Sequence, residues 1–330
     1  MPDTAPNASP AAGPSTDLGR WIHPSVLLVA TDLSDLDRLM PFAFQQAIET
    51  GTRLILLHVI EPVAAMPVDA SGLPWYNPEG TLDFAEKELE SWCKLARLQG
   101  IVCDAMAREG NAAQQIVASA RQFEADRVLL GIRSRSRLGK LLLGSVAEQV
   151  LRSVNLPVIT VGPEAHLPAE RGERVVLHAT TLRETSRPSA ALAFQIAASQ
   201  GAKLVLLHVL PPVDEMERKG LPTGLDSAAM HELRLLAAET AAGPTGNSRR
   251  IAVEPRVAHG NPIIEILAEA SERRASLIVL GATHRSAFEN LTRDRTVYRV
   301  LAHARCPVLT LRESAAASAE LESERLALHR

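Results

Sequence analysis

The chain has 330 residues, 46% hydrophobic and 22% charged, which is ordinary globular composition and excludes a disordered or collagen-like protein. A length of this size suggests two domains of roughly 150 residues each. The net charge of −3 and the aromatic content of 3% argue against a nucleic-acid or membrane-surface binder. No apolar run reaches the roughly 18 residues of a membrane span.

Residues 1–20 lack the basic start and apolar middle of a signal peptide, so we expect a disordered tail there. The three cysteines show neither metal-ligand nor redox-motif spacing, which favours reduced thiols. We therefore expect a cytoplasmic protein that contacts neither nucleic acid nor a membrane.

The first copy of a repeated pattern predicts five strands and four helices in alternation. Short apolar runs indicate strands at 26–30, 54–60, 101–108, 127–130 and 157–161. Helical spacings indicate a first helix through 39–47 that ends at Gly51, followed by helices at 82–99, 112–123 and 145–153.

The same pattern returns 150 residues later. Leu54–Val59 (LILLHV) recurs as Leu204–Val209 (LVLLHV), and Pro157–Thr160 recurs as Pro307–Thr310. A period of this length is a complete domain and not a solenoid unit. Strands that alternate with helices predict an α/β fold, with two tandem Rossmann-like domains that each hold a five-stranded parallel sheet covered by helices on both faces. Ligands of such sheets bind beyond the carboxyl ends of the strands.

A basic, glycine-containing loop follows the fourth strand. Gly131 allows a sharp turn off the strand. Gly144 and Ser145 stand at a helix start, where free N–H groups favour an anion and where the Ser145 hydroxyl could either cap the helix or bond a phosphate. Arg133, Arg135, Arg137 and Lys140 add positive charge. The alternatives are a phosphate cradle and a solvated basic loop; the Walker and dinucleotide fingerprints are both missing.

Four separated motifs together resemble the universal stress protein family. They are Val29–Ser34 (VATDLS), Leu56–Val59 (LLHV), the loop from Gly131 to Gly144-Ser145, and Leu156–Val161 (LPVITV). Nucleotide-binding members carry Gly-x2-Gly-x9-Gly-Ser/Thr in this loop, and here Ser134 replaces the middle glycine. The resemblance covers about 22–162 and again 173–312.

The resemblance implies a Rossmann-like fold and an ATP site, with Mg²⁺ as an optional companion. Asp32 would hydrogen-bond the adenosine part, and Ala30 and Val59 would line the adenine pocket. The ribose and phosphates would lie against Gly131, Arg133, Ser134, Gly144, Ser145 and Val146. A β-carbon at Ser134 would either crowd the phosphates or bring a hydroxyl to them.

The second copy departs from this motif. Thr181 stands at the place of Asp32, Asp294 replaces Gly144, and Arg295 replaces Ser145. A carboxylate within about 4 Å of a phosphate is repulsive by one to a few kcal/mol. We therefore expect one site per chain, in the first domain, and a structural role for the second domain.

The resemblance further implies that the two domains pair edge to edge through their last strands, 158–161 and 308–311, with a homodimer as a further option. We expect a first domain at 21–163, a linker at 164–172, a second domain at 173–312 and a tail at 313–330. We also expect a protein partner of unknown identity.

Several other polar residues have less specific explanations. His58 and His208 end their second strands within apolar runs, which favours hydrogen-bonded structural histidines. Asp35 is expected to act as a charge at a helix N-terminus, with a shared metal site with Asp32 as the alternative.

These patterns lead to one main hypothesis for function. It is a tandem universal stress protein that binds ATP in its first domain and acts as a stress-response regulator or sensor without catalysing a reaction. The alternatives are a scaffold or interaction protein that binds no nucleotide, and a slow ATPase.

Overall fold

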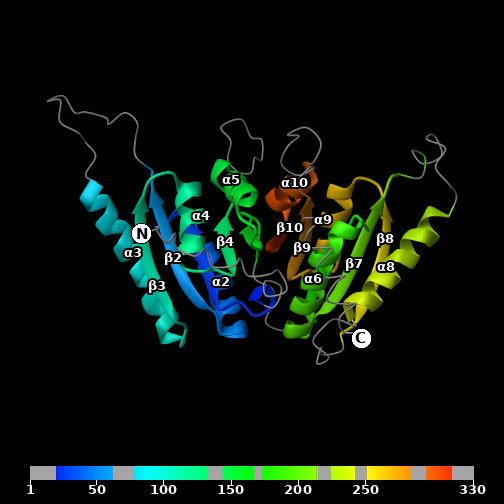
Figure 1. Ribbon diagram of the computed structural model, residues 1–330, viewed down its shortest axis with the longest axis horizontal. Helices are drawn as coiled ribbons and strands as arrows, with labels where there is room; N and C mark the ends of the chain where they lie inside the picture. Colours follow the sequence, from blue (N-terminus) through cyan, green and yellow to red (C-terminus); the bar gives the residue numbers. More distant parts are fainter. Residues whose placement is uncertain are drawn as a thin grey trace, which may run out of the picture.

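The computed structural model describes residues 20–61, 78–132, 144–166, 173–212, 214, 224–241, 251–283 and 295–313. It places two α/β domains side by side, with the first and second halves of the chain on opposite sides of a central seam (Figure 1). The elements of the first domain are β1 (Val26–Thr31), α2 (Leu36–Thr50), β2 (Arg53–Ile60), α3 (Pro78–Leu98), β3 (Cys103–Glu109), α4 (Ala112–Gln122), β4 (Arg127–Gly131), α5 (Ser145–Ser153) and β5 (Val158–Val161).

The second domain repeats this order. Its elements are β6 (Val175–Ala179), the short 3₁₀ helix η1 (Glu184–Ser186), α6 (Arg187–Gln200), β7 (Lys203–Leu210), α8 (Leu225–Ala241), β8 (Val253–His259), α9 (Pro262–Glu272), β9 (Leu277–Thr283), α10 (Arg295–His303) and β10 (Val308–Glu313). The predicted alternation of strands and helices is thus confirmed in both copies.

All the strands join one ten-stranded sheet in the order β3-β2-β1-β4-β5-β10-β9-β6-β7-β8. Pairing is parallel within each half, as the α/β class predicts. It is antiparallel at the seam, where Val308 faces Thr160 and Thr310 faces Val158. The implied pairing of the two last strands is therefore present within a single chain, and it leaves β3 and β8 as the edges of the sheet.

Helices cover both faces of this sheet. Alternate residues of β1 divide between two hydrophobic cores, with Leu27 and Val29 in one core and Leu28 and Ala30 in the other. The first core is covered by α2, α3, α6 and α8, and the second by α4, α5, α9 and α10. Strands buried on both faces need apolar residues along their whole length. For this reason the apolar runs in the sequence predicted where the strands lie.

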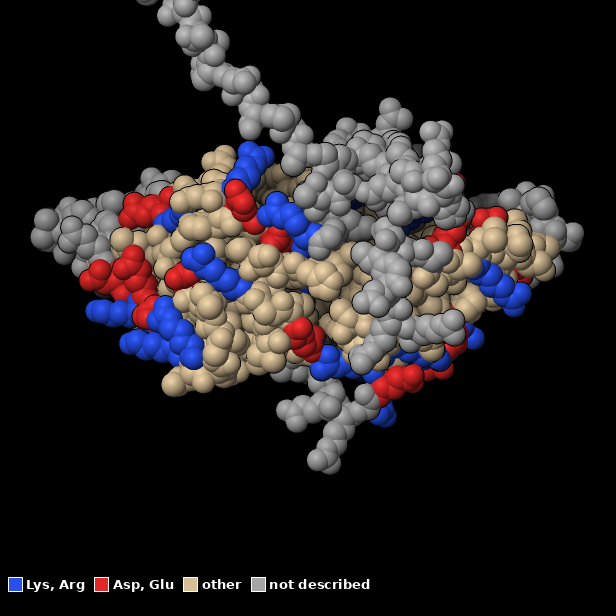
Figure 2. Space-filling model, turned by 60° about the horizontal axis from the view of Figure 1, so that its bottom comes forward, with Lys and Arg blue, Asp and Glu red and all other residues tan. Residues whose placement is uncertain are grey.

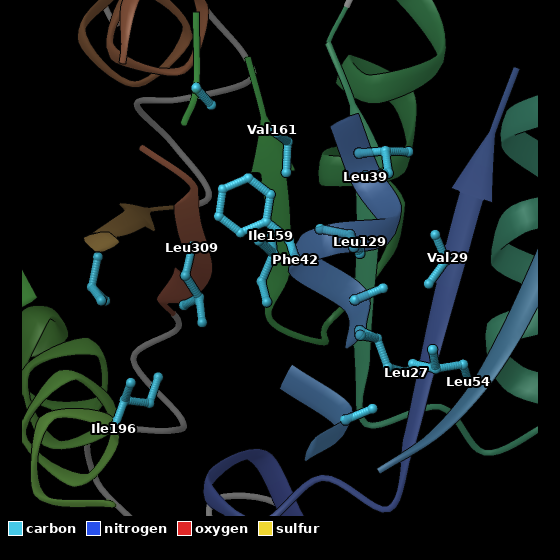
Figure 3. Packing of buried hydrophobic residues seen from close by; sticks show 14 of the residues in the cluster. Leu27, Val29, Leu39, Phe42, Leu54, Leu129, Ile159, Val161, Ile196 and Leu309 are labelled. Atoms are coloured by element: carbon cyan, nitrogen blue, oxygen red, sulfur yellow. The ribbon is translucent and has the colours of Figure 1, made fainter. Parts of the chain in front are cut away.

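One core continues across the seam. Phe42 from α2 lies near Ile159 of β5 and Leu309 of β10, and Ile196 from α6 belongs to the same cluster (Figure 3). Ile159 and Leu309 are 4% and 0% exposed. The two domains therefore share apolar packing as well as a strand pair.

Candidate functional site

The turn between β1 and α2 is held by a short chain of hydrogen bonds. The Thr31 hydroxyl accepts the Leu33 N–H at 2.9 Å and donates to Asp35 Oδ1 at 2.6 Å. Asp32 Oδ1 accepts both the N–H and the hydroxyl of Ser34, at 2.9 and 2.5 Å. Leu33 takes a positive φ of 70°, which most residues disfavour. The turn thus fixes two carboxylates at the carboxyl end of β1.

Asp35 stands at the N-terminus of α2, as the sequence predicts, but its surroundings differ from those of an ordinary helix N-terminal charge. It stands before the first residue of α2, but its side chain makes no capping hydrogen bond and is buried. Burial raises the pKa of the Asp35 carboxyl, while the hydrogen bond from Thr31 acts in the opposite direction. The reason for the difference is tertiary, because the carboxylate packs against the end of β4.

Asp35 lies directly against Gly131, the residue at which the basic loop leaves the sheet. A β-carbon on Gly131 would lie 1.9 Å from Asp35 Oδ2 and 3.1 Å from Arg38 Nη2. The glycine is thus required by these neighbours, besides any need for a turn. Arg38, from the first turn of α2, completes a group of polar side chains between β1 and β4, which are hydrogen-bonded neighbours in the sheet.

The other end of the loop is the start of α5. Gly144 occupies the N-cap position with φ −60° and ψ 145°, and Ser145 is the first residue of the helix. The alternative in which Ser145 caps the helix is therefore wrong, and its hydroxyl is exposed beside the free N–H groups. A β-carbon on Gly144 would meet nothing within 4 Å, so no protein atom among the described residues demands a glycine there.

The remaining predicted site residues fall into two groups. Ala30 is buried at the end of β1, Val59 is half-buried near the end of β2, and both contact the core beneath α4 and α5, while Val146 packs there from α5. Arg133 and Ser134 lie outside the described residues, as does Asp294 of the second copy. Sequence patterns missed Thr31 and Arg38. The three-residue step from Asp35 to Arg38 was the one signal that could have indicated the second.

His58 and His208 have matching structural positions. His58 Nδ1 donates to the Thr31 carbonyl at 2.9 Å, and His208 Nδ1 donates to the Thr180 carbonyl at 2.9 Å. Each ring therefore ties the second strand of its domain to the end of the first. The second domain keeps this hydrogen bond although it departs from the glycine-containing motif of the first. This supports a structural role for both histidines.

A small cavity of about 40 Å³ lies at the seam, away from this turn. Phe42 and Leu309 line it from the two domains, with Arg127 at its wall. The Arg127 guanidinium donates to the Trp21 carbonyl and to Gln46 Oε1, so its hydrogen-bonding groups hold the fold together. This cavity is a packing feature and does not compete with the β1–β4 site.

Surface charges, metal ligands and helix hydropathy add three observations. Figure 2 shows acidic and basic side chains intermixed on the face that it presents, without a continuous basic area among the described residues. Within the described ranges no three His, Cys, Asp or Glu side chains gather as a metal site. In the same part of the chain, no helix combines the length and apolar character that crossing a membrane requires.

Comparisons with known proteins agree with this architecture. The model of the universal stress protein family matches residues 25–162 and 173–312. A universal stress protein of Mycolicibacterium smegmatis is 27% identical over 299 residues, which cover 87% of this chain and 96% of that protein. One of Mycobacterium tuberculosis is 25% identical over 276 residues, covering 79% and 87%. The crystal structure of a universal stress protein from Archaeoglobus fulgidus aligns with a TM-score of 0.68 and 20% identity, covering 89% of this chain and 98% of the other.

Proposed function

Because this chain belongs to the universal stress protein family, we propose that its first domain binds ATP and that the protein acts as a stress-response regulator or sensor. One observation carries the proposal. The strands β1 and β4 are neighbours in the sheet, so Asp32 and Gly131 lie together at the carboxyl ends of the strands, where such sheets bind ligands.

The start of α5 suits an anion. Free N–H groups and the helix dipole favour a negative charge there. Gly144 has an unstrained backbone, and no atom of the described residues lies within 4 Å of the place of a β-carbon, so this space could accommodate a ligand. In this proposal Gly131, Gly144, Ser145 and Val146 hold the ribose and phosphates, and Arg133 and Ser134 contribute from the loop.

The adenosine part would lie toward β1 and β2. Ala30 and Val59 are apolar residues near the ends of these strands, which suits an adenine ring. Asp32 would accept a hydrogen bond from the adenosine, and the two bonds from Ser34 hold its carboxylate in place for this role. A Mg²⁺ ion would arrive with the phosphates, as is usual for this cation.

We propose binding without turnover. Hydrolysis of ATP needs a positioned water and a stabilised transition state. The Asp35 carboxylate, which lies nearest to Gly131, already accepts a hydrogen bond from Thr31 and lies near Arg38. Occupancy of the site would instead change the surface offered to a partner protein.

The test begins with the full chain purified without added nucleotide. Denaturation, chromatography and mass measurement identify any released nucleotide, and calorimetric titration measures ATP binding. We expect bound ATP or micromolar affinity, at one site per chain. Asp32→Ala should weaken binding at least tenfold, whereas the matched variant Thr181→Ala in the second domain should leave it unchanged.

Three results would overturn the proposal in whole or in part. If no ATP co-purifies and none binds at millimolar concentration, the scaffold interpretation replaces it. If bound ATP turns to ADP on standing and Asp32→Ala stops this, the protein is a slow ATPase. If Thr181→Ala weakens binding as much as Asp32→Ala, the site is not confined to the first domain.

A further inference from the structure

Toward the described residues, Arg38 uses little of its hydrogen-bonding capacity. Its contact with Asp35 is long, with Nη2 at 3.8 Å from Oδ2, which is an ion pair without a hydrogen bond. Its Nε is buried and has no hydrogen-bond partner among the described residues. A guanidinium offers five N–H donors in a planar fork that matches carboxylate and phosphate. Arg38 can therefore accept another anionic partner.

The second domain provides an internal comparison. Arg187 stands in the first turn of α6, as Arg38 does in α2. Two of its nitrogens contact the Glu184 carboxylate at 3.1 and 3.3 Å, and its Nε is also 3.8 Å from Glu239. The Glu184 side chain is 71% exposed. The arginine of the second domain is thus neutralised at the surface. That of the first domain lies beside Gly131, and among the described residues its one ion-pair contact is the long one with Asp35.

The position of Arg38 determines what an additional partner could be. Its Nη2 lies 3.1 Å from the place of a β-carbon on Gly131, where the chain enters the loop that ends at Gly144. In the function proposed above the ribose and phosphates lie against Gly131. Asp35 lies at the same point, and an uncompensated carboxylate there repels a polyphosphate. Arg38 would therefore attract the phosphate groups of a ligand, and Asp35 would repel the same groups.

We propose that Arg38 is a phosphate-binding residue of the first domain, and that Asp35 opposes it and so sets how strongly the site prefers ATP over uncharged adenosine. This inference rests on the proposed ATP binding and adds the source of discrimination to it. When a phosphorylated nucleotide binds, Arg38 gives up its long contact with Asp35 for a charge-assisted hydrogen bond to a phosphate oxygen. Adenosine has no such oxygen, so its binding does not involve Arg38.

The experiment measures the dissociation constants of ATP and adenosine for the full chain by calorimetry. Arg38→Gln should weaken ATP binding by about tenfold or more, the size expected for one charge-assisted hydrogen bond, and leave adenosine binding within about twofold. Asp35→Asn keeps an acceptor for Thr31 and removes the charge, so it should strengthen ATP binding severalfold. The matched variant Arg187→Gln should change neither constant.

Arg38→Lys extends the test and guards against misfolding of Arg38→Gln. It keeps the positive charge but loses the planar fork, and we expect ATP affinity between those of the wild type and Arg38→Gln. Equal weakening of ATP and adenosine would show that Arg38 only supports the fold and would overturn the inference, as would unchanged ATP affinity. If the wild type binds no nucleotide at all, the proposed function itself fails and this inference falls with it.

Discussion

His178 occupies the position in β6 that Val29 occupies in β1. In the sheet Leu27 pairs with Arg127 and Val176 pairs with Leu277, which is the equivalent of Arg127 in the second copy. Two residues later Val29 pairs with Leu129 and His178 with Val279, which are again equivalent positions. His178 is fully buried, and its Nδ1 donates to the Val279 carbonyl at 3.0 Å, while Nε2 finds no partner among the described residues. A hydrophobic core thus contains an imidazole where the repeat would allow valine.

This substitution predicts a pH-dependent loss of stability. Burial lowers the pKa of His178 to about 4 in the folded chain, against 6.5 for an ordinary histidine. The unfolded chain therefore takes up the proton first, and the stability is fully present above about pH 6.5 and falls as the pH drops toward 4. A difference of this size corresponds to about 3 kcal/mol. Urea unfolding at a series of pH values between 7.5 and 4.5 measures it.

His178→Val is the matched variant, because valine is the residue that the first domain uses. It should flatten the loss of unfolding free energy between pH 6.5 and pH 4.5 by a large part of that amount. His23→Gln changes an exposed histidine and should leave the pH profile as in the wild type. A His178→Val profile that parallels the wild type would show that His178 does not carry the effect.

The sequence predicted the elements of the fold closely, for a physical reason. Central strands buried on both faces must be apolar along their length, and helix α5 was predicted at its observed bounds, Ser145–Ser153. The third strand was expected from 101 but begins at Cys103. Its pattern is weaker because β3 is an edge strand with partly exposed positions.

The candidate site was indicated less completely. Asp32, Gly131 and Gly144 could be proposed as site residues because their types and spacing form a motif. The burial of Asp35 could not, since it depends on how the start of α2 packs against Gly131, almost a hundred residues further along the chain. The proposed role of Arg38 depends on the same packing, of which the three-residue step from Asp35 to Arg38 is only a partial signal.

Gly131→Ala should destabilise the first domain. The new β-carbon would overlap Asp35 Oδ2, so the carboxylate must move and its 2.6 Å bond with Thr31 is strained or lost. Overpacking of this kind costs about 1–3 kcal/mol. Urea unfolding measures the loss. In an Asp35→Ala background the same change should cost clearly less, because the clashing group is gone. Equal costs in both backgrounds would show that Asp35 is not what Gly131 accommodates.

Gly144→Ser should separate stability from binding. Serine is a better N-cap residue than glycine, the backbone already has a φ of −60°, and a β-carbon meets no atom of the described residues within 4 Å. The unfolding free energy should therefore rise by a few tenths of a kcal/mol. The added side chain takes up space that we assign to the phosphates, so ATP affinity should fall about tenfold or more. Thermal unfolding and calorimetric titration of the same sample give both values, and unchanged affinity would remove Gly144 from the site.

The seam between the domains should depend on apolar packing far more than on the ion pair between Glu49 and Arg174. Leu309 is fully buried between Ile159 and Val279 in the sheet, while Glu49 and Arg174 form a partly exposed ion pair between the domains. Leu309→Ala should cost about 2–5 kcal/mol of unfolding free energy. Glu49→Gln should cost less than about 1 kcal/mol, because solvent screens such pairs. The comparison by urea unfolding is direct, and a larger loss for Glu49→Gln than for Leu309→Ala would mean that charge, and not the shared core, holds the two domains together.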